Sequence, residues 1–233
     1  MSTLLLVRHG LTAMTGPVLA GRTPDVHLDE RGANQAAAVA ARIAVLPLSA
    51  IVTSPLERCV ETAEVIRTAQ REAGRELELQ VDERIVECGY GDWTGKPLKE
   101  LAKDPVWKVV QSQPSAARFP GGEALAEVSA RAIAAVRDWD ARLGPDAIWV
   151  ACSHGDVIKA VLADALGLHL DQFQRIVVDP CSVSVVRYTD TRPYVLRSND
   201  VGADLAAFVP PKKRPRRKSS DATVGGGAGS GSV

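Results

Sequence analysis

The chain has 233 residues, of which 45% are hydrophobic and 24% are charged, the proportions of an ordinary soluble globular protein. No apolar run is long enough to cross a bilayer, and no basic segment precedes the short apolar start, which argues against a membrane-spanning or a secreted protein. We therefore expect a cytoplasmic protein with no membrane partner.

The net charge of zero hides an uneven distribution along the chain. The segment from Pro210 onward has six Lys and Arg and one Asp, which leaves 22 basic and 27 acidic residues in the rest of the chain. We expect a folded domain over residues 1–208, followed over residues 209–233 by a disordered tail that is first basic and then Gly/Ser-rich. The basic cluster is typical of a solvated chain end, and contact of the tail with nucleic acid is the less favoured alternative.

The predicted elements alternate between strands and helices. In the first third of the chain we expect a strand over residues 3–7, an Ala-rich helix that starts at residue 28 and ends before Pro47, a strand over 49–54 and a helix over 54–74. Ser54, Pro55 and Glu57 have the spacing of a helix start in which Ser54 is the N-cap and Glu57 completes a capping box. Gly74 supplies the stop signal of the same helix.

The remainder of the chain continues the alternation after one irregular stretch. We expect a strand over 77–81, irregular structure over 82–120, a helix over 123–144, a strand over 147–153, a helix over 155–167 and strands over 181–188 and 194–198. This order favours an α/β fold, a three-layer α/β/α sandwich with a mainly parallel sheet.

Residues capable of chemistry follow three of the predicted strands. Arg8 and His9 come directly after the first strand, Arg58 lies in the first turns of the helix after the second strand, and His154 follows the strand over 147–153. In sheets of this kind ligands bind beyond the carboxyl ends of the strands. We therefore expect these four side chains to share one site.

Other candidate residues are expected to be structural. The pattern of the cysteines, which are far apart and form no C-x-x-C pair, favours reduced and mostly buried thiols over a disulfide framework or a zinc site. His27 and His169 lie in no motif and are assigned no role. Trp93 and Trp107 are expected to pack rather than to bind substrate. The cysteines are Cys59, Cys88, Cys152 and Cys181.

The candidate residues lie in four segments, LLLVRHGLT, SPLERCVETA, ECGYGDWTG and CSHGDVIKA. In this order the segments resemble the signature segments of the histidine phosphatase superfamily, in the branch that includes phosphoglycerate mutases and many small phosphatases. Two connecting segments, GRTPDVHLDERGANQA and FPGGEALAEVSAR, are also similar, and the likeness runs from Thr3 to Tyr188. The resemblance implies a phosphoglycerate mutase-like fold and an enzyme that acts on a small phosphorylated metabolite without a metal or other cofactor.

The resemblance assigns a role to each strand-end residue. His9 is expected to be the nucleophile that forms a phospho-histidine, since imidazole is neutral and nucleophilic near pH 7. Arg8 and Arg58 would each bind phosphate oxygens through a planar guanidinium group. A protonated His154 at a helix N-terminus would add a third cationic group where backbone amides also favour an anion.

The resemblance also places a general acid at Glu87. This residue stands at the start of the E-x-x-x-G-x-W-x-G pattern that Gly91, Trp93 and Gly95 complete. A carboxyl group beside a phosphate dianion is expected to have a raised pKa, so that Glu87 protonates the leaving oxygen and later accepts a proton from water. Glu83, four residues earlier, is the alternative.

The first motif departs from the family pattern at two positions. Leu11 stands where an acid often follows, and Thr15 stands where the family often has an Asn that touches the phosphate. Thr15 keeps a hydroxyl donor, although its reach is shorter. We assign Thr15, together with Gly21 of the same loop, to substrate binding.

A further departure separates two activities. The mutases of the family have a long insertion after the glutamate segment, with adjacent arginines that bind the carboxylate of the substrate, whereas residues 95–120 have no Arg-Arg pair. We therefore favour a hydrolase. A phosphomutase is the alternative within this chemistry, and a non-catalytic module that binds a phosphorylated ligand or nucleic acid is the alternative from another class. The sequence is compatible with a homodimer and does not name the substrate.

Overall fold

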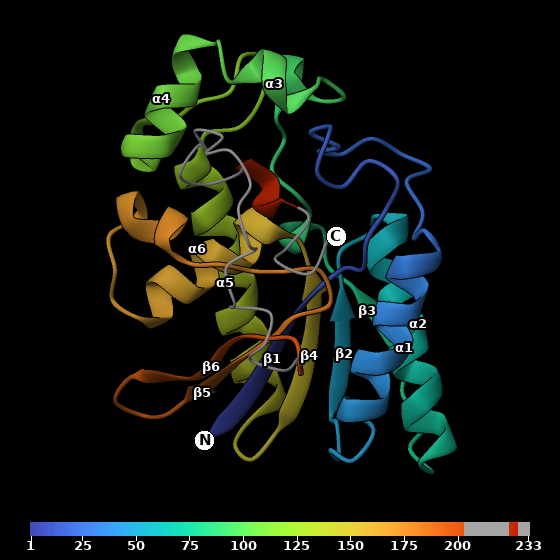
Figure 1. The fold of residues 1–233 in the computed structure, drawn as a ribbon. Helices are drawn as coiled ribbons and strands as arrows, with labels where there is room; N and C mark the ends of the chain where they lie inside the picture. The colour runs from blue at the N-terminus through green and yellow to red at the C-terminus, as the bar shows by residue number, and fades with distance from the viewer. Residues whose placement is uncertain (203–223, 228–233) are drawn as a thin grey trace, which may run out of the picture.

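A six-stranded sheet forms the centre of the fold in the computed structural model, which describes residues 1–202 and 224–227 (Figure 1). The order of the strands is β3-β2-β4-β1-β5-β6. The first four are mutually parallel, and β5 and β6 are antiparallel to their neighbours, which confirms the predicted α/β fold with a mainly parallel sheet. The strands are β1 (Ser2–Arg8), β2 (Ala50–Thr53), β3 (Leu79–Val81), β4 (Ile148–Ser153), β5 (Val183–Tyr188) and β6 (Pro193–Asp200).

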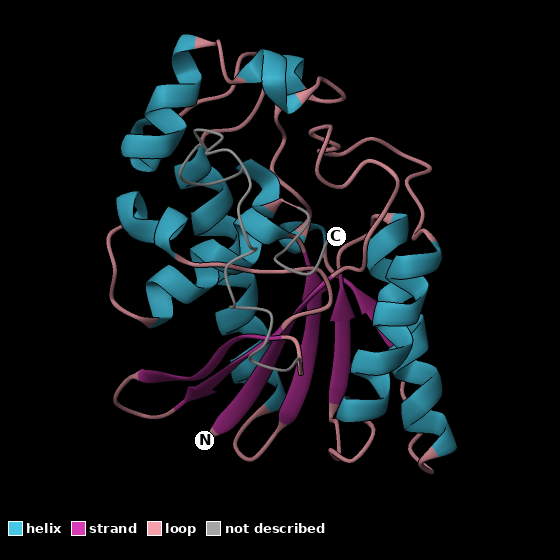
Figure 2. Ribbon diagram, viewed as in Figure 1, coloured by secondary structure: helices cyan, strands magenta, loops and turns pink. Residues whose placement is uncertain are grey.

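Helices cover both faces of the sheet (Figure 2). Leu5 of β1 belongs to the hydrophobic cluster that includes residues of α1 and α2, whereas its neighbour Leu4 belongs to the cluster that includes residues of α5 and α6. A strand covered on both faces does not alternate with polar residues, which explains the continuous apolar run at the start of the chain. The helices are α1 (Glu30–Ile43), α2 (Glu57–Glu72), α5 (Leu125–Leu143) and α6 (Gly155–Ala165).

The stretch over 82–120, expected to be irregular, contains several short helices. Helices α3 and α4 lie beyond the carboxyl ends of the parallel strands (Figure 1). The segment packs on an aromatic cluster in which the rings of Trp93 and Trp107 are stacked with their centroids 6.1 Å apart. Both indoles are buried, as expected. The short helices are η1 (Glu83–Ile85), η2 (Gly91–Trp93), α3 (Leu98–Leu101), α4 (Pro105–Ser112), η3 (Pro114–Ala116) and, later in the chain, η4 (Leu170–Arg175).

The start of α2 differs from the prediction. The helix begins at Glu57, and its N-cap is Leu56, which makes no side-chain capping bond. The Oγ atom of Ser54 instead lies 2.7 Å from Nε2 of His154. The predicted capping box is therefore wrong, because the hydroxyl of Ser54 binds an imidazole from a distant part of the chain.

The end of the chain is described only in part. The predicted domain boundary at residue 208 and most of the tail predicted over 209–233 lie outside the described residues, so both stay predictions. Within that tail the structure describes a short turn, η6 (Val224–Gly226), which lies against α6. None of the helices in the described ranges is both long and apolar enough to span a bilayer.

Candidate active site

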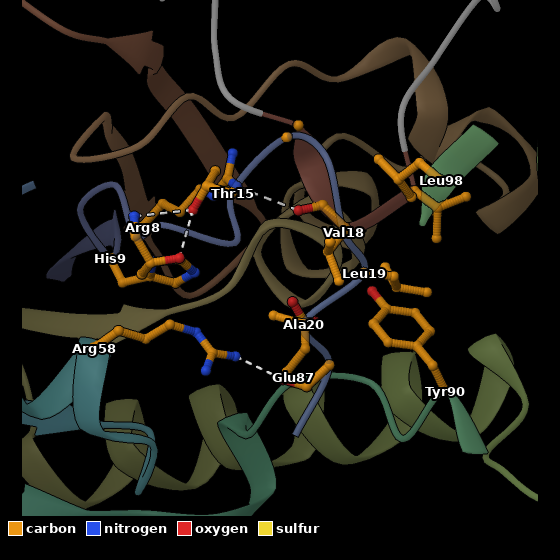
Figure 3. A pocket seen from close by; sticks show the side chains of 16 residues that line it. Arg8, His9, Thr15, Val18, Leu19, Ala20, Arg58, Glu87, Tyr90 and Leu98 are labelled. Atoms are coloured by element: carbon orange, nitrogen blue, oxygen red, sulfur yellow. Dashed lines mark hydrogen bonds between the residues drawn. The ribbon is translucent and has the colours of Figure 1, made fainter. Parts of the chain in front are cut away.

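The carboxyl ends of β1, β2 and β4 bring distant residues of the chain to one pocket (Figure 3). The register of β1 against β4 pairs Arg8 with Ser153, so the residues that follow them, His9 and His154, are neighbours. Their ring centroids are 5.3 Å apart. Most of the residues predicted for the site line the pocket, and His154 lies beside it in contact with Arg58. The predicted residues that line it are Arg8, His9, Thr15, Gly21, Arg58 and Glu87.

His9 is held in one tautomer. Its Nδ1 lies 2.7 Å from the carbonyl oxygen of Gly10, which can only accept a hydrogen bond, so Nδ1 carries the proton and Nε2 keeps a free lone pair. Burial, and then the positive charges of Arg58 and Arg8, hold the pKa of His9 well below its usual range. His9 is therefore neutral near pH 7 and has a nucleophilic nitrogen.

Arg8 and Arg58 place two buried guanidinium groups in the pocket. Nη1 of Arg8 donates to the carbonyl oxygen of Val178 at 2.8 Å, and Nη2 of Arg58 donates to that of Gly21 at 2.6 Å. Nη1 of Arg58 is buried and has no hydrogen-bond partner among the described residues. A buried donor in this state is costly unless a ligand accepts from it, and an anion in the pocket would do so.

His154 is fully buried beside the pocket. Its Nε2 contacts Ser54, as described above, and its Nδ1 lies 3.5 Å from Nη2 of Arg58, an arrangement in which Nδ1 accepts. Burial, and then the positive charge of Arg58, lower the pKa of His154 well below its usual range. Burial and the adjacent arginines therefore disfavour a positive charge on His154, and the protonated form expected from the sequence stays a prediction.

Glu87 is buried beside the two histidines. Its Oε2 lies 3.9 Å from Nδ1 of His154, and its Oε1 accepts from the backbone N–H of Cys88 at 2.9 Å. Burial and the charge of Asp156 raise the pKa of Glu87 to about 7. A carboxyl group with this pKa can both donate and accept a proton near neutral pH. Glu83, the alternative general acid, is exposed and does not line the pocket.

The backbone around Glu87 is held by arginines. Arg131 of α5 donates to three carbonyl oxygens within residues 84–87, at 2.7 to 3.1 Å, and forms an ion pair with Glu123 at 3.0 Å. Arg22 donates to the carbonyl oxygen of Glu87 at 2.8 Å from the opposite loop. These bonds fix the position of the carboxyl group although the segment that carries it is irregular.

A buried polar pair at the start of α6 was missed by the sequence analysis. Oδ2 of Asp156, which is fully buried, accepts from the hydroxyl of Tyr90 at 2.8 Å, and Nζ of Lys159 lies 3.8 Å from Oδ1. The signal for this pair was an Asp directly after the His-Gly step, at the start of a helix that is otherwise apolar. The charge of Asp156 adds to the effect of burial in raising the pKa of Glu87.

Thr15 and Gly21 line the pocket, and both make hydrogen bonds to other residues of the protein. Oγ1 of Thr15 accepts from the backbone N–H of Thr12 at 3.0 Å. Gly21 has a φ of +54°, and its carbonyl oxygen orients Arg58. Both residues position the pocket, and their direct contact with substrate stays a prediction.

Residues 224–227 also reach the pocket. The carbonyl oxygen of Gly225 accepts from Nη2 of Arg8 at 3.3 Å, and its backbone N–H donates to Oδ2 of Asp156 at 3.1 Å. Val224 is buried. This short piece of the C-terminal segment therefore contacts both a cation and an anion of the site.

None of the cysteines and histidines that were expected to be structural lines the pocket. The four cysteines are free and buried, as predicted. His27 pairs with Glu61 and His169 with Asp171, and both imidazoles are exposed. Within residues 1–202 and 224–227, no group of three or more His, Cys, Asp or Glu side chains is arranged to hold a metal ion.

The sequence and the structure were compared with known proteins. Residues 4–201 match the family model described as the histidine phosphatase superfamily, branch 1. Phosphoserine phosphatase 1 of Hydrogenobacter thermophilus is 31% identical over 204 residues, which cover 85% of this chain and 92% of that protein. The probable phosphoglycerate mutase GpmB of Cronobacter sakazakii is 32% identical over 194 residues, which cover 81% of this chain and 86% of that protein.

A solved structure shares the fold. Phosphoserine phosphatase of Entamoeba histolytica, in complex with 3-phosphoglyceric acid, superposes with a TM-score of 0.75 at 25% sequence identity. The match covers 86% of this chain and 98% of that one. The arrangement of strands and helices described above is therefore that of this group of enzymes.

Proposed function

The chain belongs to branch 1 of the histidine phosphatase superfamily and is an enzyme, and from this premise we propose that it is a phosphomonoester hydrolase that acts through a phospho-histidine on His9. The observation that carries the proposal is the convergence of a neutral imidazole with two buried guanidinium groups, one of which has a buried N–H with no partner among the residues that the structure describes. Positive charge for phosphoryl transfer then comes from side chains, without a metal.

In the first step Nε2 of His9 attacks the phosphorus atom, and the bond from phosphorus to the ester oxygen breaks. Arg8 and Arg58 stabilise the charge on the phosphoryl oxygens. The proton of Glu87 passes to the leaving oxygen, so an alcohol departs rather than an alkoxide. The unpartnered Nη1 of Arg58 supports this assignment, because it would donate to a phosphoryl oxygen.

In the second step water attacks the phosphorus atom of phospho-His9, and the phosphorus–nitrogen bond breaks. Glu87, now ionised, accepts the proton of the water, which restores its acid form. Inorganic phosphate leaves, and the imidazole returns to its starting state. A bound phosphate dianion would raise the pKa of His154, so the protonated form expected from the sequence belongs to the liganded enzyme.

The experiment that tests the proposal is release of inorganic phosphate from a panel of phosphomonoesters. The His9→Ala variant is expected to lose activity about a thousandfold or more, since no nucleophile replaces the imidazole, while phosphate still binds to Arg8 and Arg58. His169→Ala, which changes an exposed imidazole away from the pocket, is the matched control and is expected to keep full activity. Activity of His9→Ala close to that of the parent would overturn the assignment of the nucleophile.

A phosphomutase is the second candidate, favoured by the likeness to a probable phosphoglycerate mutase. The hydrolase is favoured by residues 95–120, which have no Arg-Arg pair to bind a carboxylate. Incubation with 3-phosphoglycerate and a trace of bisphosphoglycerate separates the two. Isomerisation faster than release of phosphate would replace the hydrolase with the mutase.

A further inference from the structure

The wall of the pocket that faces the phosphate-binding groups is apolar. Figure 3 shows Val18, Leu19, Leu98 and the ring of Tyr90 on the side opposite the arginines and His9. A phosphoryl group bound to the arginines would direct its leaving group toward this wall. The wall therefore contacts the part of the substrate that differs from one phosphomonoester to another.

The apolar wall is a built feature of the fold. Residues 17–19 pair with residues 95–98 through three backbone hydrogen bonds of 2.8 to 3.1 Å, and Val18 and Pro97 form an antiparallel bridge. Leu19 is 3% exposed. This pairing fixes the position of Leu98, the first residue of α3.

In the part of the chain that the structure describes, the positive charge that lines the pocket lies on its phosphate side. Among the described residues that line the pocket, Arg8 and Arg58 are the only Lys or Arg. Arg22, at the edge of the site, is committed to Glu123 at 2.7 Å and to a backbone carbonyl. A carboxylate on the leaving group would thus meet hydrophobic side chains and the carboxyl group of Glu87.

Resting on the proposed hydrolase function, we propose that this wall selects phosphomonoesters whose leaving group is uncharged and apolar, such as aryl or branched alkyl groups, over esters whose leaving group carries a carboxylate. Leu98 and Val18 are the specificity-determining residues. Burial of an apolar leaving group on these side chains favours binding, and a carboxylate in the same place is disfavoured because the side chains of Val18 and Leu98 offer no hydrogen-bond donor to offset its desolvation.

The test compares two esters that differ by one carboxylate group, phenyl phosphate and 3-carboxyphenyl phosphate. The carboxylate at this position scarcely alters the phenolate as a leaving group, so the comparison reports on contacts with the wall. We expect kcat/KM to be at least about tenfold higher for phenyl phosphate. Equal values, or a preference for the carboxylated ester, would overturn the inference.

Two variants test whether Leu98 is the source of the preference for phenyl phosphate. Leu98→Lys is expected to reduce the preference to about threefold or less, because the ammonium group compensates the carboxylate. Leu98→Ala is expected to lower kcat/KM for phenyl phosphate three- to tenfold, roughly the effect of removing methylenes from an apolar pocket. The matched control is Leu168→Lys, the same change at a half-exposed position beyond the far end of α6, which is expected to leave the preference unchanged.

The outcomes separate this inference from the proposed function. Release of phosphate from both esters at equal rates would leave the hydrolase intact and overturn the apolar selection alone. No release from either ester or from a wider panel would overturn the hydrolase function and, with it, the inference. An unchanged preference in Leu98→Lys would also contradict the wall as its source.

Discussion

His9 shows how a single backbone bond determines the reacting atom. The carbonyl oxygen of Gly10 holds the proton of the imidazole on Nδ1, so the lone pair is on Nε2. Glu87 is the complementary group, because burial and the charge of Asp156 raise its pKa while burial and the arginines lower that of His9. Opposite shifts of this kind give a base and an acid that coexist in one pocket near neutral pH.

The raised pKa of Glu87 predicts an activity that falls in alkaline solution. The phosphorylation step needs the protonated carboxyl group, so kcat/KM for an alkyl phosphate is expected to decrease above about pH 7, roughly tenfold per pH unit. The measurement is a pH profile with an alkyl ester and with p-nitrophenyl phosphate, whose leaving group needs no proton. An alkyl-ester profile that stays flat to pH 9 would contradict the role of Glu87.

The same carboxyl group is expected to limit stability. Its folded-state pKa of about 7 lies above the ordinary value of 4.5, so its favourable contribution is present at acidic pH and is lost as the pH rises through 7. Glu87→Gln removes the cost of burying the ionised form, and we expect the free energy of unfolding at pH 8 to rise by about 1–3 kcal/mol.

Chemical denaturation at pH 5 and pH 8 measures this effect on stability. Glu87→Gln is expected to raise the free energy of unfolding at pH 8. The increase is expected to be small at pH 5, where the carboxyl group of the parent is already neutral. Glu83→Gln, four residues away and exposed, serves as the control. A gain of equal size at both pH values would point to a cause other than ionisation.

At the scale of elements, the site depends on contacts between segments that are not themselves catalytic. The backbone of Gly10 lies so close to α1 that a Cβ atom at this position would meet the carbonyl oxygen of Gly32 at 2.6 Å. On the opposite side, Arg131 connects α5 to the loop that carries Glu87. The nucleophile and the general acid are thus each positioned by packing against a helix.

Arg131 is therefore expected to act as a positioning residue. Arg131→Met removes the donors to residues 84–87, and we expect kcat for an alkyl ester to fall about 10- to 100-fold, with a smaller change for p-nitrophenyl phosphate. The pH at which the alkyl-ester activity declines is also expected to move, because Glu87 becomes more solvated. Steady-state kinetics with both esters measures these changes, and Arg137→Met, on an exposed part of the same helix, is the control. An equal loss with both esters would indicate general damage.

At the scale of the whole molecule, the pocket joins segments from residue 8 to residue 225 around one anion site. A ligand that contacts several segments at once stabilises the whole fold, since unfolding must release it. The unpartnered N–H of Arg58 and the low pKa of His154 both indicate that the pocket gains more from an anion than from water.

Inorganic phosphate or vanadate is therefore expected to raise the unfolding temperature. At a ligand concentration of one hundred times Kd, the free energy of unfolding rises by about 2.7 kcal/mol. For a protein of this size this corresponds to an increase of several degrees in the unfolding temperature. Differential scanning fluorimetry measures the shift, and Arg58→Gln is expected to reduce it strongly. The control is Arg187→Gln, an exposed position on β5. The same shift in parent and Arg58→Gln would contradict the anion site.

The binding is also expected to be stronger at lower pH. A dianion raises the pKa of His154, so phosphate and a proton bind together at this site. Calorimetry in buffers of different ionisation enthalpy would detect the proton taken up. Glu87, whose pKa of about 7 a dianion also raises, contributes to this uptake, so the measurement is repeated with Glu87→Gln, in which the remaining uptake reports on His154. Binding to that variant with no proton uptake would mean that His154 stays neutral in the complex.

The residues that meet at the site were largely predictable from the sequence. Arg8, His9, Arg58 and Glu87 lie in motifs, and three of the motifs directly follow strands of a parallel sheet. Because the carboxyl ends of parallel strands meet at one edge, local pattern and topology together are enough to bring such residues into one pocket. The apolar strands and amphipathic helices likewise follow from local periodicity.

The charges and partners of these groups were decided by the tertiary structure alone. Ser54 binds His154 instead of capping α2, burial and the arginines lower the pKa of His154, and burial and the charge of Asp156 raise that of Glu87. A pKa depends on burial and on the sum of charges from every segment around the group, and no local stretch contains that sum. The sequence by itself thus determined which side chains converge, whereas their protonation and orientation required the folded environment.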